Sequence, residues 1–230
     1  MSLTKLRSIA EEKKSRIILA LDYKGRFGYQ GLLEMVEKYV AGVKIGYPAL
    51  FDLGPSNLKK LISSFRERLF FIADFKIADI PAISREIASR LRDLGFEAAI
   101  VHAVAGADTV RAVAEVMPAF ALVAMTHRGA SVINTHVEQL IEFGVEGGAS
   151  GYVAPATYPE IVSLVRREAP GSVIISPGVG AQGGGFGGAL KAGADFEIIG
   201  RAITLSTDPE ETALRILSSQ REATPDDVLA

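Results

Sequence analysis

The chain has 230 residues, a formal net charge of −2 and an isoelectric point near 6.0, and it contains no cysteine. Without cysteine it has neither disulfides nor thiolate metal sites, and its charge gives no general electrostatic reason to bind nucleic acid. No apolar run reaches the roughly 18 residues that span a membrane, and the charged N-terminal segment lacks the apolar core of a secretory signal. We therefore expect a cytoplasmic protein that binds neither nucleic acid nor a membrane.

Short apolar runs alternate with helical patterns along the chain. Near-continuous Ile, Val, Leu and Ala are typical of parallel strands covered on both faces. In chain order, the strands are predicted at 16–21, 40–45, 69–75, 98–101, 120–124, 151–154, 173–176 and 196–199. A helix is predicted at 3–14, before the first strand, and the later helices at 31–38, 56–66, 82–94, 108–116, 132–142, 158–168, 187–191 and 209–219.

Two of these helix starts carry capping signals. Thr157 with Glu160 has the spacing of a capping box, and Asp208 is followed by Pro209 and Glu211. We expect both Thr157 and Asp208 to cap the helices that follow them.

Eight strand–helix units in a chain of this length predict an α/β fold, a single-domain (β/α)8 TIM barrel with a short N-terminal helix. An open doubly wound sheet is the alternative. We expect the barrel to occupy residues 1–220. Residues 221–230 carry charge without periodicity, so we expect them to form a flexible tail.

One hydrophobic run ends in three charges: residues 70–81 read FFIADFKIADIP. Side chains alternate along a strand, so Asp74 and Lys76 should share the inner face of the barrel, with Asp79 beyond the strand end. An internal salt bridge would be the purely structural explanation. Barrel chemistry, however, lies at the carboxyl ends of the strands, and three charges in six residues there favour a catalytic site.

Other predicted strands also end in polar residues, namely Asp22, Lys44, His102, Thr126 and Arg201. Taken singly, Asp22 could form a turn, Lys44 could be solvated and His102 could be a hydrogen-bonded structural residue. Because the carboxyl ends of barrel strands meet at one rim, we expect these side chains to converge there.

Residues 176–188 hold seven glycines in thirteen positions, including a GxGxxG match that starts at Gly178. A dinucleotide fingerprint opens an early βαβ unit, whereas this loop follows the seventh strand. In a barrel the loops after strands seven and eight commonly bind phosphate, and Gln182 and Arg201 could donate hydrogen bonds to its oxygens. A flexible lid is the alternative.

Several short motifs occur in one order: LALD at 19–22, VKIG at 43–46, DFKIADIP at 74–81, MTH at 125–127, PGVGAQG at 177–183 and GR at 200–201. With these motifs the sequence resembles the orotidine 5'-monophosphate decarboxylase family in its compact archaeal form. The resemblance covers nearly the whole predicted barrel. It implies a homodimer that decarboxylates orotidine 5'-monophosphate to UMP, the last step of de novo UMP synthesis, without a metal or another cofactor.

The resemblance also implies roles for individual residues. The substrate-binding residues would be Asp22, Lys44, Thr126, Pro177, Gln182, Gly200 and Arg201, with ribose hydroxyls on Asp22 and Lys44, the pyrimidine edge on Thr126, and the 5'-phosphate on Gln182 and Arg201. The catalytic residues would be Lys76, Asp74, Asp79 and Lys44. Lys76 would stabilise and protonate the C6 carbanion, and Asp79 would come from the partner subunit.

The wider family includes Mg²⁺-dependent 3-keto-gulonate 6-phosphate decarboxylases and hexulose phosphate synthases, which carry an acidic residue where this chain has Lys44. An ammonium group cannot ligate Mg²⁺, so Lys44 favours the metal-free reaction. Two positions depart from the expected pattern: Ile83 replaces a threonine that contacts the ligand across the dimer, and Gly185-Phe186 replaces Asp-Pro.

Two further classes stay open. One is a Schiff-base aldolase, whose lysine must be neutral, although neighbouring carboxylates favour the charged form. The other is a non-catalytic nucleotide sensor.

Overall fold

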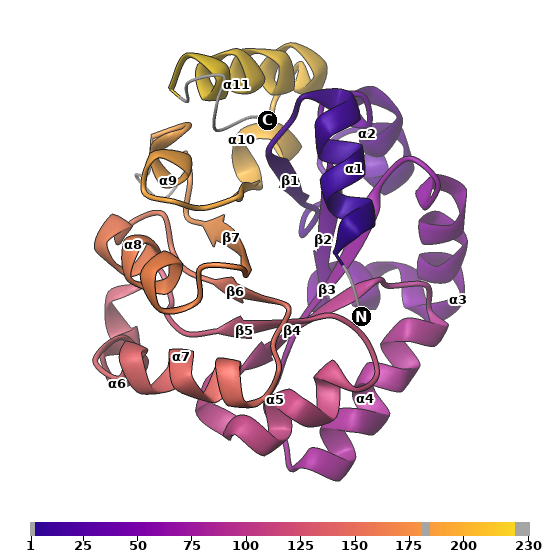
Figure 1. Cartoon of the computed structure of the whole chain (residues 1–230). Coiled ribbons are helices and arrows are strands. Elements are labelled where there is room, and N and C mark those ends of the chain that lie inside the picture. Colours follow the sequence, from indigo (N-terminus) through magenta and orange to yellow (C-terminus); the bar gives the residue numbers. More distant parts are fainter. Residues whose placement is uncertain (1–2, 181–184, 224–230) are drawn as a thin grey trace.

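The computed structural model describes residues 3–180 and 185–223. Eight parallel strands follow one another around a closed barrel, and β8 pairs with β1 (Figure 1). The predicted (β/α)8 barrel is thereby confirmed. Every predicted strand overlaps an observed one: β1 (Ile17–Ala20), β2 (Gly42–Gly46), β3 (Phe70–Ile77), β4 (Ala98–His102), β5 (Ala119–Leu122), β6 (Gly151–Val153), β7 (Val173–Pro177) and β8 (Phe196–Ile199).

The helices form a ring around the barrel (Figure 1). Within the described ranges they are α1 (Thr4–Lys13), α2 (Gly28–Val36), α3 (Tyr47–Phe65), α4 (Pro81–Asp93), α5 (Ala107–Ala114), α6 (Ser131–Asn134), α7 (Val137–Glu146), α8 (Pro159–Glu168), α9 (Gly188–Lys191), α10 (Arg201–Thr204) and α11 (Pro209–Ala223). The 3-10 turn η1 (Ala103–Ala105) follows β4, and the 3-10 turn η2 (Arg128–Ala130) precedes α6. None of these helices is long and apolar enough to cross a bilayer.

Alternate residues of each strand face two different cores. On β3, Phe70 and Ile72 belong to the cluster inside the barrel, whereas Phe71, Ala73 and Phe75 pack towards the helices. This is the alternation predicted for the strand, and it turns Asp74 inward. The same two-sided burial explains why the strands read as continuous apolar runs.

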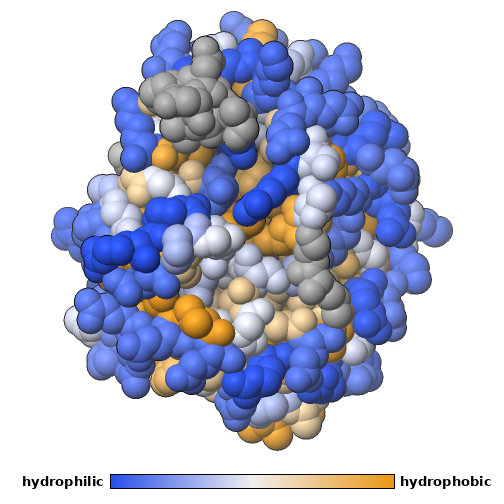
Figure 2. Space-filling model, in the orientation of Figure 1, coloured by the Kyte–Doolittle hydropathy of each residue, from blue (hydrophilic) through white to orange (hydrophobic). Residues whose placement is uncertain are grey.

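Helix α1 covers the barrel interior at the end opposite to the polar strand ends. Its apolar residues Leu6, Ile9 and Ala10 join the inner cluster, and Lys5 forms an ion pair with Glu97, which precedes β4. In Figure 2 hydrophilic residues cover most of the outer part of the face that carries α1. Closure of this end leaves the carboxyl end of the strands for the site.

The largest differences between the predicted and the observed helices lie at three places. Helix α3 starts nine residues early, at Tyr47, and is interrupted at Gly54, which has a φ of 69°. The single helix predicted at 132–142 is divided into α6 and α7, because Thr135 and His136 direct side-chain hydrogen bonds to backbone carbonyls. Helix α10, which has four residues, was not predicted.

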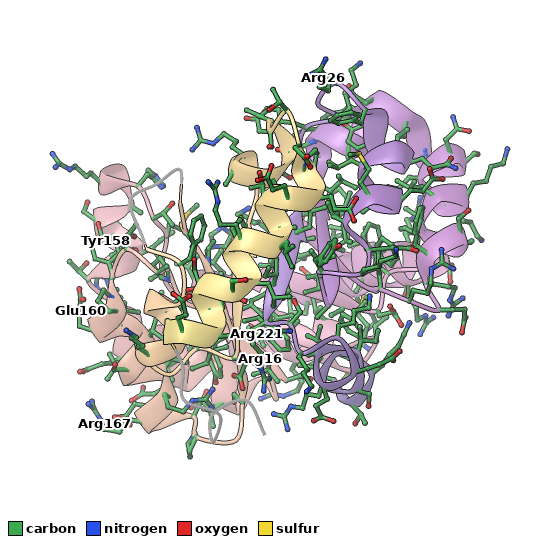
Figure 3. The ribbon with its side chains drawn as sticks, turned by 90° about the horizontal axis from the view of Figure 1, so that it is seen from above. Arg16, Arg26, Tyr158, Glu160, Arg167 and Arg221 are labelled. Atoms are coloured by element: carbon green, nitrogen blue, oxygen red, sulfur yellow. The ribbon has the colours of Figure 1, made fainter. Side chains whose placement is uncertain are left out.

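One predicted cap is confirmed and the other is wrong. Asp208 Oδ1 accepts the N–H of Glu211 at 2.9 Å. Helix α8 instead begins at Pro159 after Tyr158, and the hydroxyl of Thr157 is buried without a hydrogen-bond partner in the described ranges. Tyr158 and Glu160 lie at the outer side of the barrel (Figure 3). Thr157 is one residue too far from the helix to reach its free N–H groups.

At the C-terminus, α11 continues to Ala223, beyond the predicted helix end at 219. The remainder of the expected tail, 224–230, lies outside the described residues. The division into a barrel of 1–220 and a tail of 221–230 stays a prediction.

Candidate active site

A cavity of about 500 Å³ opens at the carboxyl ends of the strands. Its floor is apolar and comes from inward-facing strand residues such as Ile100, Leu122, Val153 and Ile198. The predicted site residues that line it are Asp22, Lys44, Asp74, Lys76, Thr126, Pro177, Gly200 and Arg201. The predicted convergence of polar strand ends is therefore present for the six polar residues among them, whereas His102 does not line the cavity.

Asp74 lies between two ammonium groups. Its Oδ2 accepts a hydrogen bond from Lys44 Nζ at 2.5 Å, and its Oδ1 accepts one from Lys76 Nζ at 2.8 Å. Lys44 Nζ also lies 3.6 Å from Asp22 Oδ2. Four charges of alternating sign thus extend from the end of β1, through β2, to β3.

The two central members of this row are deeply buried. The side chains of Lys44 and Asp74 are each 8% exposed, against 32% for Asp22 and 39% for Lys76. Burial by itself would lower the pKa of Lys44, but the carboxylates of Asp74 and Asp22 outweigh it and raise that pKa. Burial would likewise raise the pKa of Asp74, but Lys44 and Lys76 hold it below its ordinary value. Both groups are therefore charged near neutral pH.

The backbone at Lys76 departs from regular strand geometry. Lys76 has a φ of 45°, in the left-handed region that residues with a side chain rarely adopt, and the pairing of β3 with β4 shifts register between Ala73 and Ile77. The ion pair of Lys76 with the buried Asp74 helps to hold this conformation. Such local strain is typical of functional positions.

The loops after β7 and β8 form another side of the cavity, and β8 pairs with β1. Pro177 ends β7 and is followed by Gly178 and Val179, and Gly200 and Arg201 follow β8. Arg201 is exposed, so its guanidinium group is available to a ligand. The remaining predicted phosphate residue, Gln182, lies outside the described residues.

The loop after β5 carries Thr126, and the backbone of the preceding residue, Met125, is held by a side chain of α6. The side-chain amide of Asn134 accepts the N–H of Met125 and donates to its carbonyl, both at 2.9 Å. Asn134 thereby fixes the backbone next to Thr126. Sequence reasoning missed Asn134 because it lies in a predicted helix, and it missed the cavity-lining Met125 because an apolar residue there carries no chemical signal.

Asp79 does not line the cavity of its own chain. It is exposed, and its carboxylate accepts the N–H of Ile80 at 2.7 Å. Its backbone carbonyl accepts hydrogen bonds from Ser84 Oγ and Thr109 Oγ1, both at 2.9 Å. The backbone at Asp79 is fixed while its side chain lies at the surface.

His102 lies near the same charges without the hydrogen bond expected of a structural histidine. Its Nδ1 is buried and has no hydrogen-bond partner within the described ranges. Burial, reinforced by the positive charge of Lys76 and opposed by Asp74, lowers the pKa of His102. The imidazole is therefore neutral at neutral pH.

The donors at this site do not suit a divalent cation. Among residues 3–180 and 185–223 there is no group of three or more His, Cys, Asp or Glu side chains that could hold a metal ion. The carboxylates that do converge, Asp22 and Asp74, have the ammonium group of Lys44 between them. That ammonium group would repel a cation and cannot ligate it.

Comparisons with known proteins identify the family of the chain. Residues 15–216 match the family model described as orotidine 5'-phosphate decarboxylase / HUMPS family. The chain is 40% identical over 208 residues to the orotidine 5'-phosphate decarboxylase of Thermococcus kodakarensis, covering 89% of this chain and 96% of that protein. It is 39% identical over 212 residues to the corresponding protein of Methanococcoides burtonii, with 89% and 97% covered.

A solved structure gives the same result. The orotidine 5'-monophosphate decarboxylase from Methanocaldococcus jannaschii, complexed with the inhibitor BMP, has a TM-score of 0.82 and 32% sequence identity, covering 90% of this chain and 99% of that one. The resemblance stated from the motifs is confirmed, and the chain belongs to the orotidine 5'-phosphate decarboxylase / HUMPS family.

Proposed function

We propose that this protein decarboxylates orotidine 5'-monophosphate to UMP without a metal or another cofactor. The observation that carries the proposal is the buried Asp74 carboxylate, held between Lys44 and Lys76 at the edge of the cavity. The family membership of the chain supports the proposed substrate, because the relatives at 39–40% identity are named orotidine 5'-phosphate decarboxylases. The ammonium group of Lys44 favours this activity over the Mg²⁺-dependent members of the wider family.

In this proposal the substrate spans the cavity from the phosphate side to the charged row. Arg201 binds the 5'-phosphate together with Gln182, with Pro177 and Gly200 beside it. Asp22 and Lys44 bind the ribose hydroxyls, and Thr126 meets the pyrimidine edge. The apolar floor then accepts the base, which places the C6 carboxylate near Asp74 and Lys76.

The chemical step breaks the bond between C6 and the carboxylate carbon. CO₂ leaves, the electron pair stays on C6, and the nearby ammonium group of Lys76 stabilises the developing negative charge. Lys76 then transfers a proton to C6 to give UMP, and the resulting amine is reprotonated from solvent. Before the bond breaks, the substrate carboxylate and Asp74 at ~4 Å repel each other by roughly 4 kcal/mol at an effective dielectric of 20. Phosphate and ribose binding offset this cost.

A homodimer completes the site, with Asp79 of one subunit reaching the cavity of the other. The exposed carboxylate of Asp79 supports this arrangement, as do the large apolar side chains exposed on the segments after β2 and β3. Phe51 is 78% exposed, Ile80 64% and Ile83 45%. Apolar surface of this kind is typical of an interface, and the dimer axis would present the same patch twice. At Ile83 the contact with the partner would be apolar rather than polar.

An ultraviolet assay of orotidine 5'-monophosphate turnover, with and without EDTA, tests the function. We expect conversion to UMP at the same rate in both conditions. Binding of UMP without turnover would identify a nucleotide sensor instead, and loss of turnover in EDTA would contradict the metal-free reaction. Covalent trapping of Lys76 by borohydride with a sugar phosphate would support an aldolase.

A further inference from the structure

A buried carboxylate lies outside the cavity, on the helix-facing side of β8. Glu197 is fully buried, and its neighbours Phe196 and Ile198 face the barrel interior. In the part of the chain that the structure describes, Glu197 is held by hydrogen-bond donors and forms no ion pair with a cation. A buried carboxylate is costly unless such donors compensate it, so its hydrogen bonds are strong constraints on the groups that make them.

The donors come from two other elements of the fold. Glu197 Oε2 accepts the N–H of Gly187 and the Nε2 of Gln220, both at 2.9 Å, and Oε1 accepts the N–H of Ala189 at 3.1 Å. Burial raises the pKa of the Glu197 carboxyl, and these donors oppose the rise. We name this arrangement of Glu197, Gly187, Ala189 and Gln220 the Glu197 anchor. It ties β8 to the start of α9 and to α11.

The anchor admits little freedom at Gly187. This residue has a φ of 81°, and a Cβ there would collide with the Cβ of Ala223 on α11. Helix α11 packs against α9, α10 and α2, and Figure 3 shows it lying between the two halves of the chain. Gly187 is thus confined between the carboxylate of β8 and the surface of α11, and the end of the glycine-rich loop has a fixed position.

Phe186, which directly precedes Gly187, connects this fixed end of the loop to the cavity. The ring of Phe186 occupies the space beside Gly180: a Cβ on Gly180 would lie 3.2 Å from Phe186 Cε1 and 3.7 Å from the Cβ of Ala202. Gly180 directly follows Val179, and Ala202 directly follows Arg201, and both Val179 and Arg201 line the cavity. Phe186 therefore packs where the backbones of the two phosphate-side loops meet.

We propose that Glu197 is a positioning residue, which holds the Phe186–Gly187 end of the glycine-rich loop against Gly180 and thereby sets the affinity of the site for the 5'-phosphate of its ligand. The proposal rests on the proposed function for the identity of that ligand. Glu197 touches no substrate; it acts through the backbone of Gly187 and the ring of Phe186. Its effect should therefore depend on the phosphate and be absent for the nucleoside.

Glu197→Gln is the informative variant. The amide keeps the shape, but its nitrogen cannot accept a hydrogen bond. At the Oε1 position it loses the N–H of Ala189, and at the Oε2 position it loses the donors from both Gly187 and Gln220. Glu97→Gln is the matched control, because Glu97 also accepts a backbone N–H, from Phe71 at 3.1 Å, but lies at the opposite end of the barrel. Both variants should lower thermal stability, and only the first should affect phosphate binding.

The assay is inhibition of orotidine 5'-monophosphate turnover by UMP and by uridine, with KM and kcat measured alongside. For Glu197→Gln we expect the KM and the UMP inhibition constant to rise about tenfold, as for loss of one charge-assisted hydrogen bond. The uridine inhibition constant and kcat should stay within about twofold of wild type, and Glu197→Asp should recover part of the UMP affinity. If Glu197→Gln does not fold, Phe186→Ala replaces it with the same expected selectivity.

Three results would overturn the inference. They are wild-type UMP affinity in a folded Glu197→Gln or Phe186→Ala protein, an equal loss of UMP and uridine affinity, and an equal effect in Glu97→Gln. A wild-type protein that neither binds UMP nor turns over orotidine 5'-monophosphate would instead refute the proposed function, and the inference with it.

Discussion

The buried pair of Lys44 and Asp74 makes a prediction about stability that does not depend on the proposed reaction. In Lys44→Met the side chain keeps its approximate length and loses its charge. Asp74 then remains 8% exposed with Lys76, itself 39% exposed, as its counter-ion. Removing one partner of a buried pair typically costs about 3–5 kcal/mol, and the surviving contact with Lys76 places our expectation near 3 kcal/mol.

Lys5→Met is the matched control. Lys5 forms an equally short ion pair, 2.5 Å from Glu97, but its side chain is 36% exposed. Pairs accessible to water contribute about 1 kcal/mol or less. Urea unfolding of both variants at pH 7, followed by far-ultraviolet circular dichroism, should therefore give a loss of unfolding free energy at least twofold larger for Lys44→Met.

The pH dependence of the loss tests its electrostatic cause. In the wild type the pKa of Asp74 in the folded state is below its unfolded value of 3.8, so the stability it contributes is present above that value and is lost as the pH falls through the folded pKa. In Lys44→Met, the main charge that lowers the pKa of Asp74 is gone, while the burial that raises this pKa remains. Asp74 should then bind a proton more readily in the folded state than in the unfolded state. The difference in unfolding free energy between wild type and Lys44→Met should therefore shrink as the pH falls from 7 to 4. A cost below 1 kcal/mol, or a deficit that does not change with pH, would refute this reasoning.

Three further predictions concern the proposed reaction. Lys76→Ala should lower kcat by about 10⁴-fold or more, since it removes both the proton donor and the charge that stabilises C6, while UMP still binds in calorimetry; near-normal turnover would exclude Lys76 as the donor. Mixing Lys76→Ala with Asp79→Ala subunits should restore about a quarter of wild-type activity, because half of randomly mixed dimers are heterodimers with one intact site of two; no recovery after demonstrated subunit exchange would argue against Asp79 acting in trans. Arg201→Ala should weaken UMP binding by about tenfold to a hundredfold, whereas Arg167→Ala on the outer face of α8 should not; unchanged UMP affinity in Arg201→Ala would remove Arg201 from the phosphate site.

The glycine-rich loop illustrates a limit of sequence reasoning. Its composition indicated a phosphate loop, and Gly178 lines the cavity. Glu197 carried no such signal, because a glutamate inside an apolar strand reads as an isolated exception. Its partners Gly187 and Gln220 are 10 and 23 positions away in the chain, so only the packing of α9 and α11 on β8 reveals that they share one carboxylate.

The sequence by itself determined the barrel, its inward and outward strand faces, the polar ends of the strands and the family. These features are local: apolar runs, two-residue alternation and contiguous motifs can be read without knowing what lies nearby in space. Tertiary structure decided that Asp74 is held by Lys44 and Lys76, that the hydroxyl of Thr157 caps no helix, and that His102 has a buried Nδ1 without a partner in the described ranges. Lys44 and Asp74 are 30 positions apart in the chain, so only the fold brings them together. The other contacts depend on local backbone conformation and on burial, which sets the strength of a charge interaction and cannot be read from residue order.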